Sequence, residues 1–97
     1  MRLKDEVAII TGAGRGIGSV IARRFAAEGA RVVVADLDEA SARGVADEIT
    51  AAGGIAIGLK VDVSETTTVQ SLIDATCERF GKLDILVNNA GIARAQK

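Results

Sequence analysis

Four glycines at the alternate positions 12, 14, 16 and 18 are the first feature of this 97-residue sequence that suggests chemistry. They stand between an apolar run at 7–10 and an amphipathic segment, so they form a loop that leads from a strand into a helix. The amino end of a helix presents unpaired N–H groups and a partial positive charge, which together hold phosphate groups. Glycines leave room for the phosphates and permit positive φ. The stretch therefore predicts a phosphate-binding loop, and a flexible glycine turn without a ligand is the alternative.

The spacing of the glycines narrows the kind of loop. The pattern G-x-G-x-x-G is not matched from Gly12, because position 17 is isoleucine. The pattern T-G-x-x-x-G-x-G is matched by Thr11, Gly12, Gly16 and Gly18. A P-loop is excluded, since no Lys-Ser or Lys-Thr pair follows the glycines at the required position.

Charged residues in and near the loop bear on which dinucleotide could bind. Asp36 follows the apolar run 32–35, and its carboxylate could accept both ribose hydroxyls of an adenosine while repelling a 2′-phosphate. This favours NAD over NADP. A helix cap is the alternative function of Asp36, although Asp38 could cap the next helix instead. Arg15 could approach a 2′-phosphate or be a solvated loop charge.

Two later strand ends carry further candidates. Asp62 and Val63 close the segment 54–63, where they would flank an adenine; alternatively, Asp62 is a loop or capping residue. Asn89 belongs to "VNNAG", which comes after the apolar run 85–87. Asn-Asn pairs are common in turns, but this pair would fall in the same crevice.

The hydrophobic pattern predicts the elements that position these residues. Short apolar runs at 7–10, 32–35 and 85–87 are typical of strands buried in a parallel sheet, and the segment 54–63, with Gly58 and Lys60, suits a strand nearer an edge. Between them the period changes to that of a helix. The apolar faces expected for the three helices are Ile17, Val20, Ile21 and Phe25; Ala42, Val45, Ala46, Ile49 and Ala52; and Val69, Leu72, Ile73, Cys77 and Phe80. Ser64 is the expected N-cap of the third helix, and Gly29, Gly53 and Gly81 are expected to end the three helices.

The resulting order, β-α-β-α-β-α-β, predicts an α/β fold with a parallel sheet. If the fourth strand returns beside the first, the strand order is 3-2-1-4, a partial Rossmann-like doubly wound sheet. The first two helices would then cover one face and the third helix the other. The outer edge of the fourth strand would be left short of cover.

Composition limits the class of protein. The chain is expected to be one domain, residues 1–97, with a net charge of -1 and 48% apolar residues. It has no clustered basic face and few aromatic residues, so nucleic acid is not an expected partner. The single cysteine and the absence of histidine exclude an internal disulfide and Cys/His metal patterns. No signal peptide or membrane span is visible, so a cytoplasmic location without a membrane partner is expected.

Taken together, the motifs resemble the short-chain dehydrogenase/reductase family of NAD(P)-dependent oxidoreductases. The matching stretches are "TGAGRGIG" at 11–18, "VVVADLD" at 32–38, "VDV" at 61–63 and "DILVNNAG" at 84–91. The resemblance implies that Thr11 ties the glycine loop to the "NNAG" strand end, that Asp36 holds the adenosine ribose, and that NAD is the favoured cofactor. The other cofactor-binding residues that it implies are Gly12, Arg15, Gly16, Ile17 and Gly18 at the pyrophosphate and towards the nicotinamide, Asp62 and Val63 at adenine, and Asn89, Ala90 and Gly91 at the ribose next to nicotinamide.

The sequence departs from the family after the last of these motifs. The family's catalytic Asn, Ser and Tyr-x-x-x-Lys lie beyond the end of this chain, which contains no tyrosine, so no catalytic residue is assigned. We expect a truncated cofactor-binding portion that binds NAD without turnover. The alternatives are a non-catalytic interaction module that associates with a second copy or another chain through the fourth strand's edge, and a fragment complemented by a C-terminal half.

Overall fold

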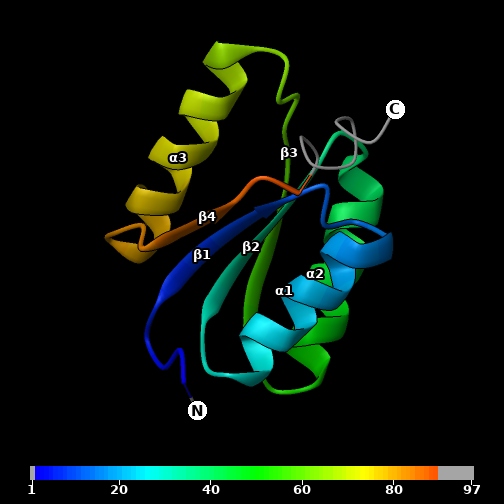
Figure 1. Cartoon of the computed structure of the whole chain (residues 1–97), viewed down its shortest axis with the longest axis vertical. Helices are drawn as coiled ribbons and strands as arrows, with labels where there is room; N and C mark the ends of the chain where they lie inside the picture. Colours follow the sequence, from blue (N-terminus) through cyan, green and yellow to red (C-terminus); the bar gives the residue numbers. More distant parts are fainter. Residues whose placement is uncertain (1, 90–97) are drawn as a thin grey trace.

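A computed structural model describes residues 2–89 of the chain (Figure 1). Within these residues, four parallel strands form one sheet in the order β3-β2-β1-β4. The elements are β1 (Val7–Thr11), α1 (Gly16–Ala27), β2 (Arg31–Asp36), α2 (Glu39–Ala51), β3 (Ile55–Lys60), α3 (Thr66–Phe80) and β4 (Ile85–Val87). The predicted fold class and strand order are confirmed. None of the helices in this described part is long and apolar enough to span a membrane.

The two central strands form the buried middle of the sheet. Every residue of β1 is buried, because the strand has a partner on each side: Ile9 lies opposite Val33 of β2 and Leu86 of β4. The outer strands β3 and β4 are only partly buried. The segment predicted to lie at an edge is therefore at an edge.

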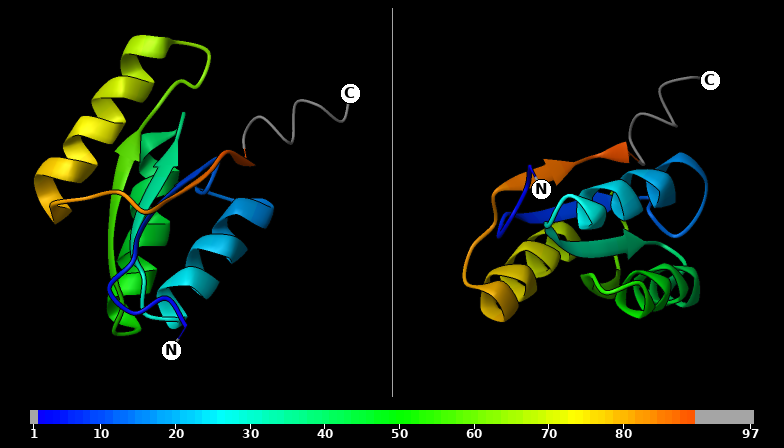
Figure 2. Two further views of the ribbon diagram at one scale, coloured as in Figure 1. Left: turned by 60° about the vertical axis from the view of Figure 1, so that its left-hand side comes forward. Right: turned by 90° about the horizontal axis from the view of Figure 1, so that it is seen from below.

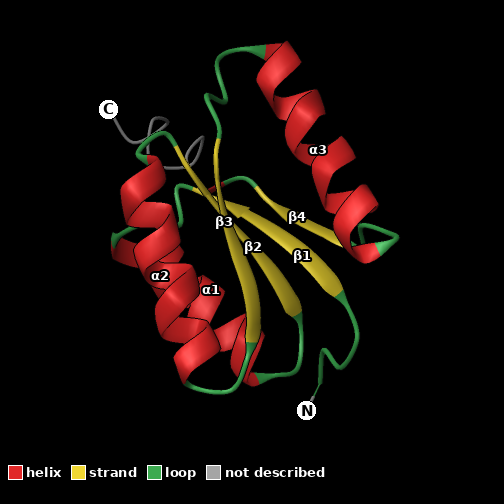
Figure 3. Cartoon of the chain, turned by 180° about the vertical axis from the view of Figure 1, so that it is seen from behind, coloured by secondary structure: helices red, strands yellow, loops and turns green. Residues whose placement is uncertain are grey.

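The helices form one layer on each side of the sheet. Figures 1 and 3 show α3 on one side and α1 and α2 together on the other. Successive side chains of a strand point to opposite faces of the sheet. Ile10, Val32 and Val34 therefore pack with α1 and α2. Ile9 and Val33 pack on the other face, under α3. The view from below in Figure 2 shows the same arrangement, which is the one expected.

The predicted inner face of α1 is partly wrong. Ile17 and Val20 are 73% and 62% exposed. The residues of α1 that are buried are small: Gly18, Ser19 and Ala22. The physical reason is a close approach of the helix to the preceding loop, since a Cβ at Gly18 would lie 2.1 Å from the Gly12 carbonyl oxygen. Only small side chains fit on that side, and the bulkier ones are turned away from it.

Two details of α3 also differ from prediction. Ser64 is not its N-cap: the helix begins at Thr66 with Glu65 as the N-cap residue. The Asp62 carboxylate accepts hydrogen bonds from both the amide and the hydroxyl of Ser64, at 3.0 and 2.6 Å, and so holds Ser64 in the turn before the helix. Cys77 is exposed rather than packed on the sheet.

The predicted helix ends are confirmed. Gly29, Gly53 and Gly81 follow or close the three helices with φ of 96°, 97° and 84°. This left-handed backbone region favours glycine.

Candidate functional site

The glycine loop lies at the carboxyl edge of the sheet, between the end of β1 and the start of α1. Gly12 and Gly16 have φ of 63° and 60°, the positive values that the glycines were expected to permit. The Ala13 amide donates to the Ala35 carbonyl, at 3.0 Å, which fixes the loop against the end of β2. In an open parallel sheet this edge is where ligands bind.

The amino end of α1 is open to an anion. Its N-cap residue, Arg15, makes no side-chain capping hydrogen bond, and its first turn contains no acidic residue. By contrast, α2 is capped by its own Asp38 and has Glu39 in its first turn. A Cβ at Gly16 would meet no atom within 4 Å, so the first turn of α1 borders open space. These features fit a pyrophosphate held by backbone N–H groups.

The end of β4 braces the loop from the other side. The Thr11 hydroxyl lies 3.3 Å from the Val87 carbonyl oxygen, to which it donates, and 3.2 Å from Asn88 Oδ1. The Asn89 side-chain amide donates to the Gly12 carbonyl, at 3.3 Å. The tie between Thr11 and the "NNAG" strand end is therefore present. Ala90 and Gly91, which are also predicted to line the site, lie outside the described residues.

Asp36 is the last residue of β2 and is only 8% exposed. Its Oδ2 accepts the Gly14 amide at 2.9 Å, and its Oδ1 accepts the Asp38 amide at 3.0 Å. The carboxylate thus joins the glycine loop to the start of α2. The cap of α2 is Asp38, which accepts the Ser41 amide, so the capping alternative for Asp36 is wrong.

Sequence reasoning did not assign a function to Gly14. A Cβ there would lie 2.8 Å from Ser41 Cβ and 2.9 Å from Asp36 Oδ2, so a side chain would press on both β2 and α2. The signal is present in the sequence as the second of four alternating glycines. The matched pattern T-G-x-x-x-G-x-G treats that position as free and therefore does not identify it.

Arg15 has an acidic neighbour that the sequence did not reveal. Its guanidinium Nη2 lies 3.6 Å from Asp38 Oδ2, and both side chains are substantially exposed. Hydrogen bonds from the Ser41 amide and then the Ser41 hydroxyl, with a further contribution from the charge of Arg15, lower the pKa of Asp38. The guanidinium of Arg15 therefore lies beside the start of α2.

The candidates after β3 lie beyond the strand. β3 ends at Lys60, and the Val61 amide donates to the Asp36 carbonyl at 3.0 Å, which keeps this segment beside the end of β2. The carboxylate of Asp62 accepts from Ser64, as a loop residue does, and Val63 packs against the core under α3. Asp62 and Val63 therefore follow directly after Val61, the residue whose amide is bonded to the end of β2.

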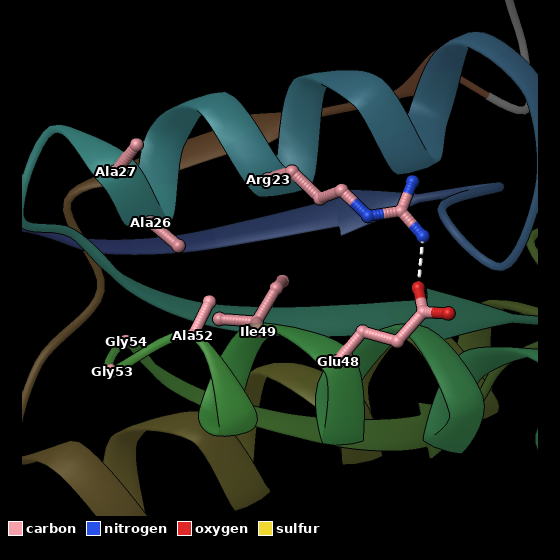
Figure 4. A pocket seen from close by; sticks show the side chains of 8 residues that line it. All are labelled: Arg23, Ala26, Ala27, Glu48, Ile49, Ala52, Gly53 and Gly54. Atoms are coloured by element: carbon pink, nitrogen blue, oxygen red, sulfur yellow. Dashed lines mark hydrogen bonds and ion pairs between the residues drawn. The ribbon is translucent and has the colours of Figure 1, made fainter.

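A hollow of about 510 Å³ lies away from this edge, between the carboxyl-terminal halves of α1 and α2 (Figure 4). Its lining is mostly small and apolar, and includes Ala26, Ile49 and Ala52. Arg23 and Glu48 pair across one end of it. Because its charged lining residues are paired with each other, the hollow is a weaker candidate for binding a charged ligand than the glycine loop.

The strand order, the glycine loop at the carboxyl edge and the acidic end of β2 define a doubly wound α/β domain of the Rossmann type. Residues 6–97 match the family model described as short chain dehydrogenase, and the chain belongs to this family.

Several curated relatives are similar over nearly the whole chain. A 2,5-dichloro-2,5-cyclohexadiene-1,4-diol dehydrogenase of Sphingobium indicum is 48% identical over 94% of this chain and 36% of its own length. A galactitol 2-dehydrogenase of Agrobacterium fabrum is 49% identical over 95% of this chain and 35% of its own. The crystal structure of a hydroxysteroid dehydrogenase from Escherichia coli has a TM-score of 0.88 at 46% identity, covering 90% of this chain and 37% of that one. The chain thus spans a little over a third of the length of these relatives.

Proposed function

We propose that this chain binds a nicotinamide dinucleotide, with NAD favoured over NADP, as the cofactor-binding portion of a short-chain dehydrogenase. The observation that carries the proposal is the open amino end of α1, where Gly16 borders unfilled space and no side chain caps the helix. The buried carboxylate of Asp36 stands at the end of the neighbouring strand. A dinucleotide needs both features, one for its pyrophosphate and one for its adenosine ribose.

Each residue has a stated role in this proposal. Backbone groups around Gly12, Arg15, Gly16, Ile17 and Gly18 hold the pyrophosphate. Asp36 accepts the ribose hydroxyls, and its negative charge repels a 2′-phosphate. Asp62 and Val63 flank the adenine, and Asn89, with Ala90 and Gly91, lines the ribose next to the nicotinamide.

The bound cofactor would supply hydride transfer, but a proton acceptor for an alcohol is a separate need. The sequence contains no tyrosine. The hydroxyls of Ser19, Ser41, Ser64 and Ser71 each donate to a nearby carbonyl or carboxylate oxygen. We therefore propose that this chain alone binds cofactor without turnover. Because its relatives are named for a diol, galactitol and a hydroxysteroid, we propose that the activity to which it contributes is dehydrogenation of an alcohol.

The test is a titration of the chain with NADH and NADPH, followed by cofactor fluorescence, which is convenient because the chain lacks tryptophan and tyrosine. The unsubstituted chain, called the parent below, should bind NADH saturably and more tightly than NADPH. Gly16→Ala should weaken NADH binding at least about tenfold, because the methyl group enters the space reserved for the phosphates.

Gly53→Ala is the matched control for that substitution. Gly53 also has positive φ and no atom within 4 Å of an added Cβ, but it follows α2 at the other edge of the sheet. Both variants therefore carry a backbone strain of about 1–3 kcal/mol, and only Gly16→Ala should lose affinity. Equal losses in the two variants would point to strain alone, and absence of NADH binding to the parent would remove the proposal.

A second candidate is association through β4, with a second copy or with a polypeptide that completes the sheet. Within the described residues β4 pairs only with β1, and Leu86 is 49% exposed. An unpaired strand edge beside apolar side chains favours association. For association with a second copy, elution from a size-exclusion column should depend on protein concentration but not on NAD, and Leu86→Lys should abolish that dependence; a strict monomer would contradict self-association. Complementation by a C-terminal half would instead appear as NAD reduction on mixing the two polypeptides.

A further inference from the structure

Asp36, Asp38 and Arg15 form a connected cluster at the outer side of the glycine loop. Asp36 Oδ1 accepts the Asp38 amide at 3.0 Å, and Asp38 Oδ2 lies 3.6 Å from Arg15 Nη2. Asp38 is thus one hydrogen bond away from the carboxylate assigned to the adenosine ribose. If Asp36 accepts the ribose hydroxyls, as proposed above, a 2′-phosphate would lie near this cation and these two anions.

The two anions act differently. Asp36 is buried, and both of its oxygens accept backbone amides, so its position is fixed by the loop and by α2. Asp38 is exposed and bifunctional: its Oδ1 accepts the Ser41 amide, while its Oδ2 accepts the Ser41 hydroxyl and faces Arg15. The capping contact orients the carboxylate, and the Arg15 guanidinium lies beside its Oδ2.

We infer that Asp38 is a positioning residue that sets cofactor preference through Arg15, by drawing the guanidinium to the start of α2 and away from a 2′-phosphate. The inference rests on the proposed function and deepens it. Arg15 on its own would favour NADP, because a guanidinium binds phosphate strongly. Paired with Asp38, it adds no net positive charge to the loop, and the discrimination by Asp36 is left unopposed.

The substitution that tests this is Asp38→Asn. Asparagine is as good an N-cap as aspartate, so its side-chain oxygen can still accept the Ser41 amide and α2 should be retained. The amide nitrogen that replaces Oδ2 carries no negative charge for Arg15. The matched variants are Arg15→Gln and the double variant, which together complete a double-mutant cycle.

Dissociation constants for NADH and NADPH are measured on the 97-residue chain in all four forms. The NADH value serves as the internal reference, because the two cofactors differ only in the 2′-phosphate. In Asp38→Asn, NADPH affinity relative to NADH should rise about threefold to tenfold, the size expected when an exposed ion pair is exchanged for a phosphate contact. In the Arg15→Gln background, the same change should shift the ratio by less than about twofold.

Three results would overturn the inference while leaving the proposed function in place. An unchanged ratio in Asp38→Asn would mean that the pair does not affect discrimination. An equal shift with and without Arg15 would mean that Asp38 repels the 2′-phosphate directly. A parallel loss of both cofactors would mean that Asp38 is only a cap. Failure of the parent to bind NADH would instead refute the proposed function, on which this inference depends.

Discussion

Replacing Gly18 with alanine tests the close contact between α1 and the glycine loop. The new Cβ would lie 2.1 Å from the Gly12 carbonyl oxygen and 2.8 Å from Asn89 Nδ2. Its main obstacle is backbone rather than the end of a flexible side chain, so the loop or the helix must move by about 1.3 Å or more to restore ordinary contact. The loop is held by β1, β2 and β4 and has little freedom to move.

The expected magnitude is the difference between two opposing effects. Overpacking of a tight site costs about 1–3 kcal/mol, and contact with a fixed carbonyl puts this site near about 3 kcal/mol. Alanine in place of a helical glycine regains about 1 kcal/mol. The free energy of unfolding should therefore fall by about 2 kcal/mol. With a urea m-value of about 1–2 kcal/mol/M, the unfolding midpoint falls by about 1–2 M.

The assay is urea unfolding followed by far-UV circular dichroism, with Gly44→Ala as the control. Gly44 is also inside a helix, but an added Cβ there meets no atom within 4 Å. It should gain about 0.5–1 kcal/mol, so the two substitutions have opposite signs. If Gly18→Ala were as stable as the parent, the close contact would not exist in solution and the explanation for the exposed Ile17 and Val20 would be wrong.

Three further predictions concern single side chains. Hydrogen bonds from the Val7 amide and then from the Lys82 ammonium lower the pKa of Asp84 below its usual 3.8. The ionised carboxylate therefore stabilises the folded chain above pH 3.8, and this stabilisation is lost as the pH falls through the lowered pKa. On acidification, the urea midpoint should fall less in Asp84→Asn than in the unsubstituted chain. Asp36→Ala should narrow the NADH-to-NADPH affinity ratio, whereas an unaltered ratio would leave Asp36 only its ties to the loop and α2. Cys77 should react with a thiol reagent without denaturant because it is exposed, and Cys77→Ser should leave both the urea midpoint and NADH affinity unchanged; a slow native-state reaction would contradict its exposure.

The sequence predicted the sheet well because its signals are local. Each apolar run is short and bounded by glycine or polar residues, and right-handed crossovers leave few arrangements of four parallel strands. The glycine loop was located for the same reason, since its pattern is contiguous. Its positive φ at Gly12 and Gly16 and its position at the carboxyl edge are direct consequences of that pattern.

The wrong predictions concern features that depend on how closely two elements approach, or on which of two groups bonds a given residue. Periodicity identified apolar residues on α1, but it carries no information on how closely the helix approaches Gly12, and this distance decides that small residues face inward. Ser64 is a good capping residue by type, yet Asp62 holds it before the helix begins. The pair Arg15–Asp38 joins a loop to a helix cap, and nothing in the sequence around either residue indicates the other.

The unequal anchoring of the four strands has a consequence for the native-state dynamics of the loop. β1 is buried and paired on both sides, whereas β4 has three residues and, within residues 2–89, one partner. Amide hydrogens of β4 should therefore exchange through a partial opening that leaves β1 and β2 protected. Each such opening separates Thr11 and Asn89 from their contacts and frees one side of the glycine loop. Only molecules with β4 docked would then bind a ligand of the loop at full strength, so the apparent affinity would be lowered in proportion to the docked fraction. A bound ligand should in turn slow amide exchange in β4.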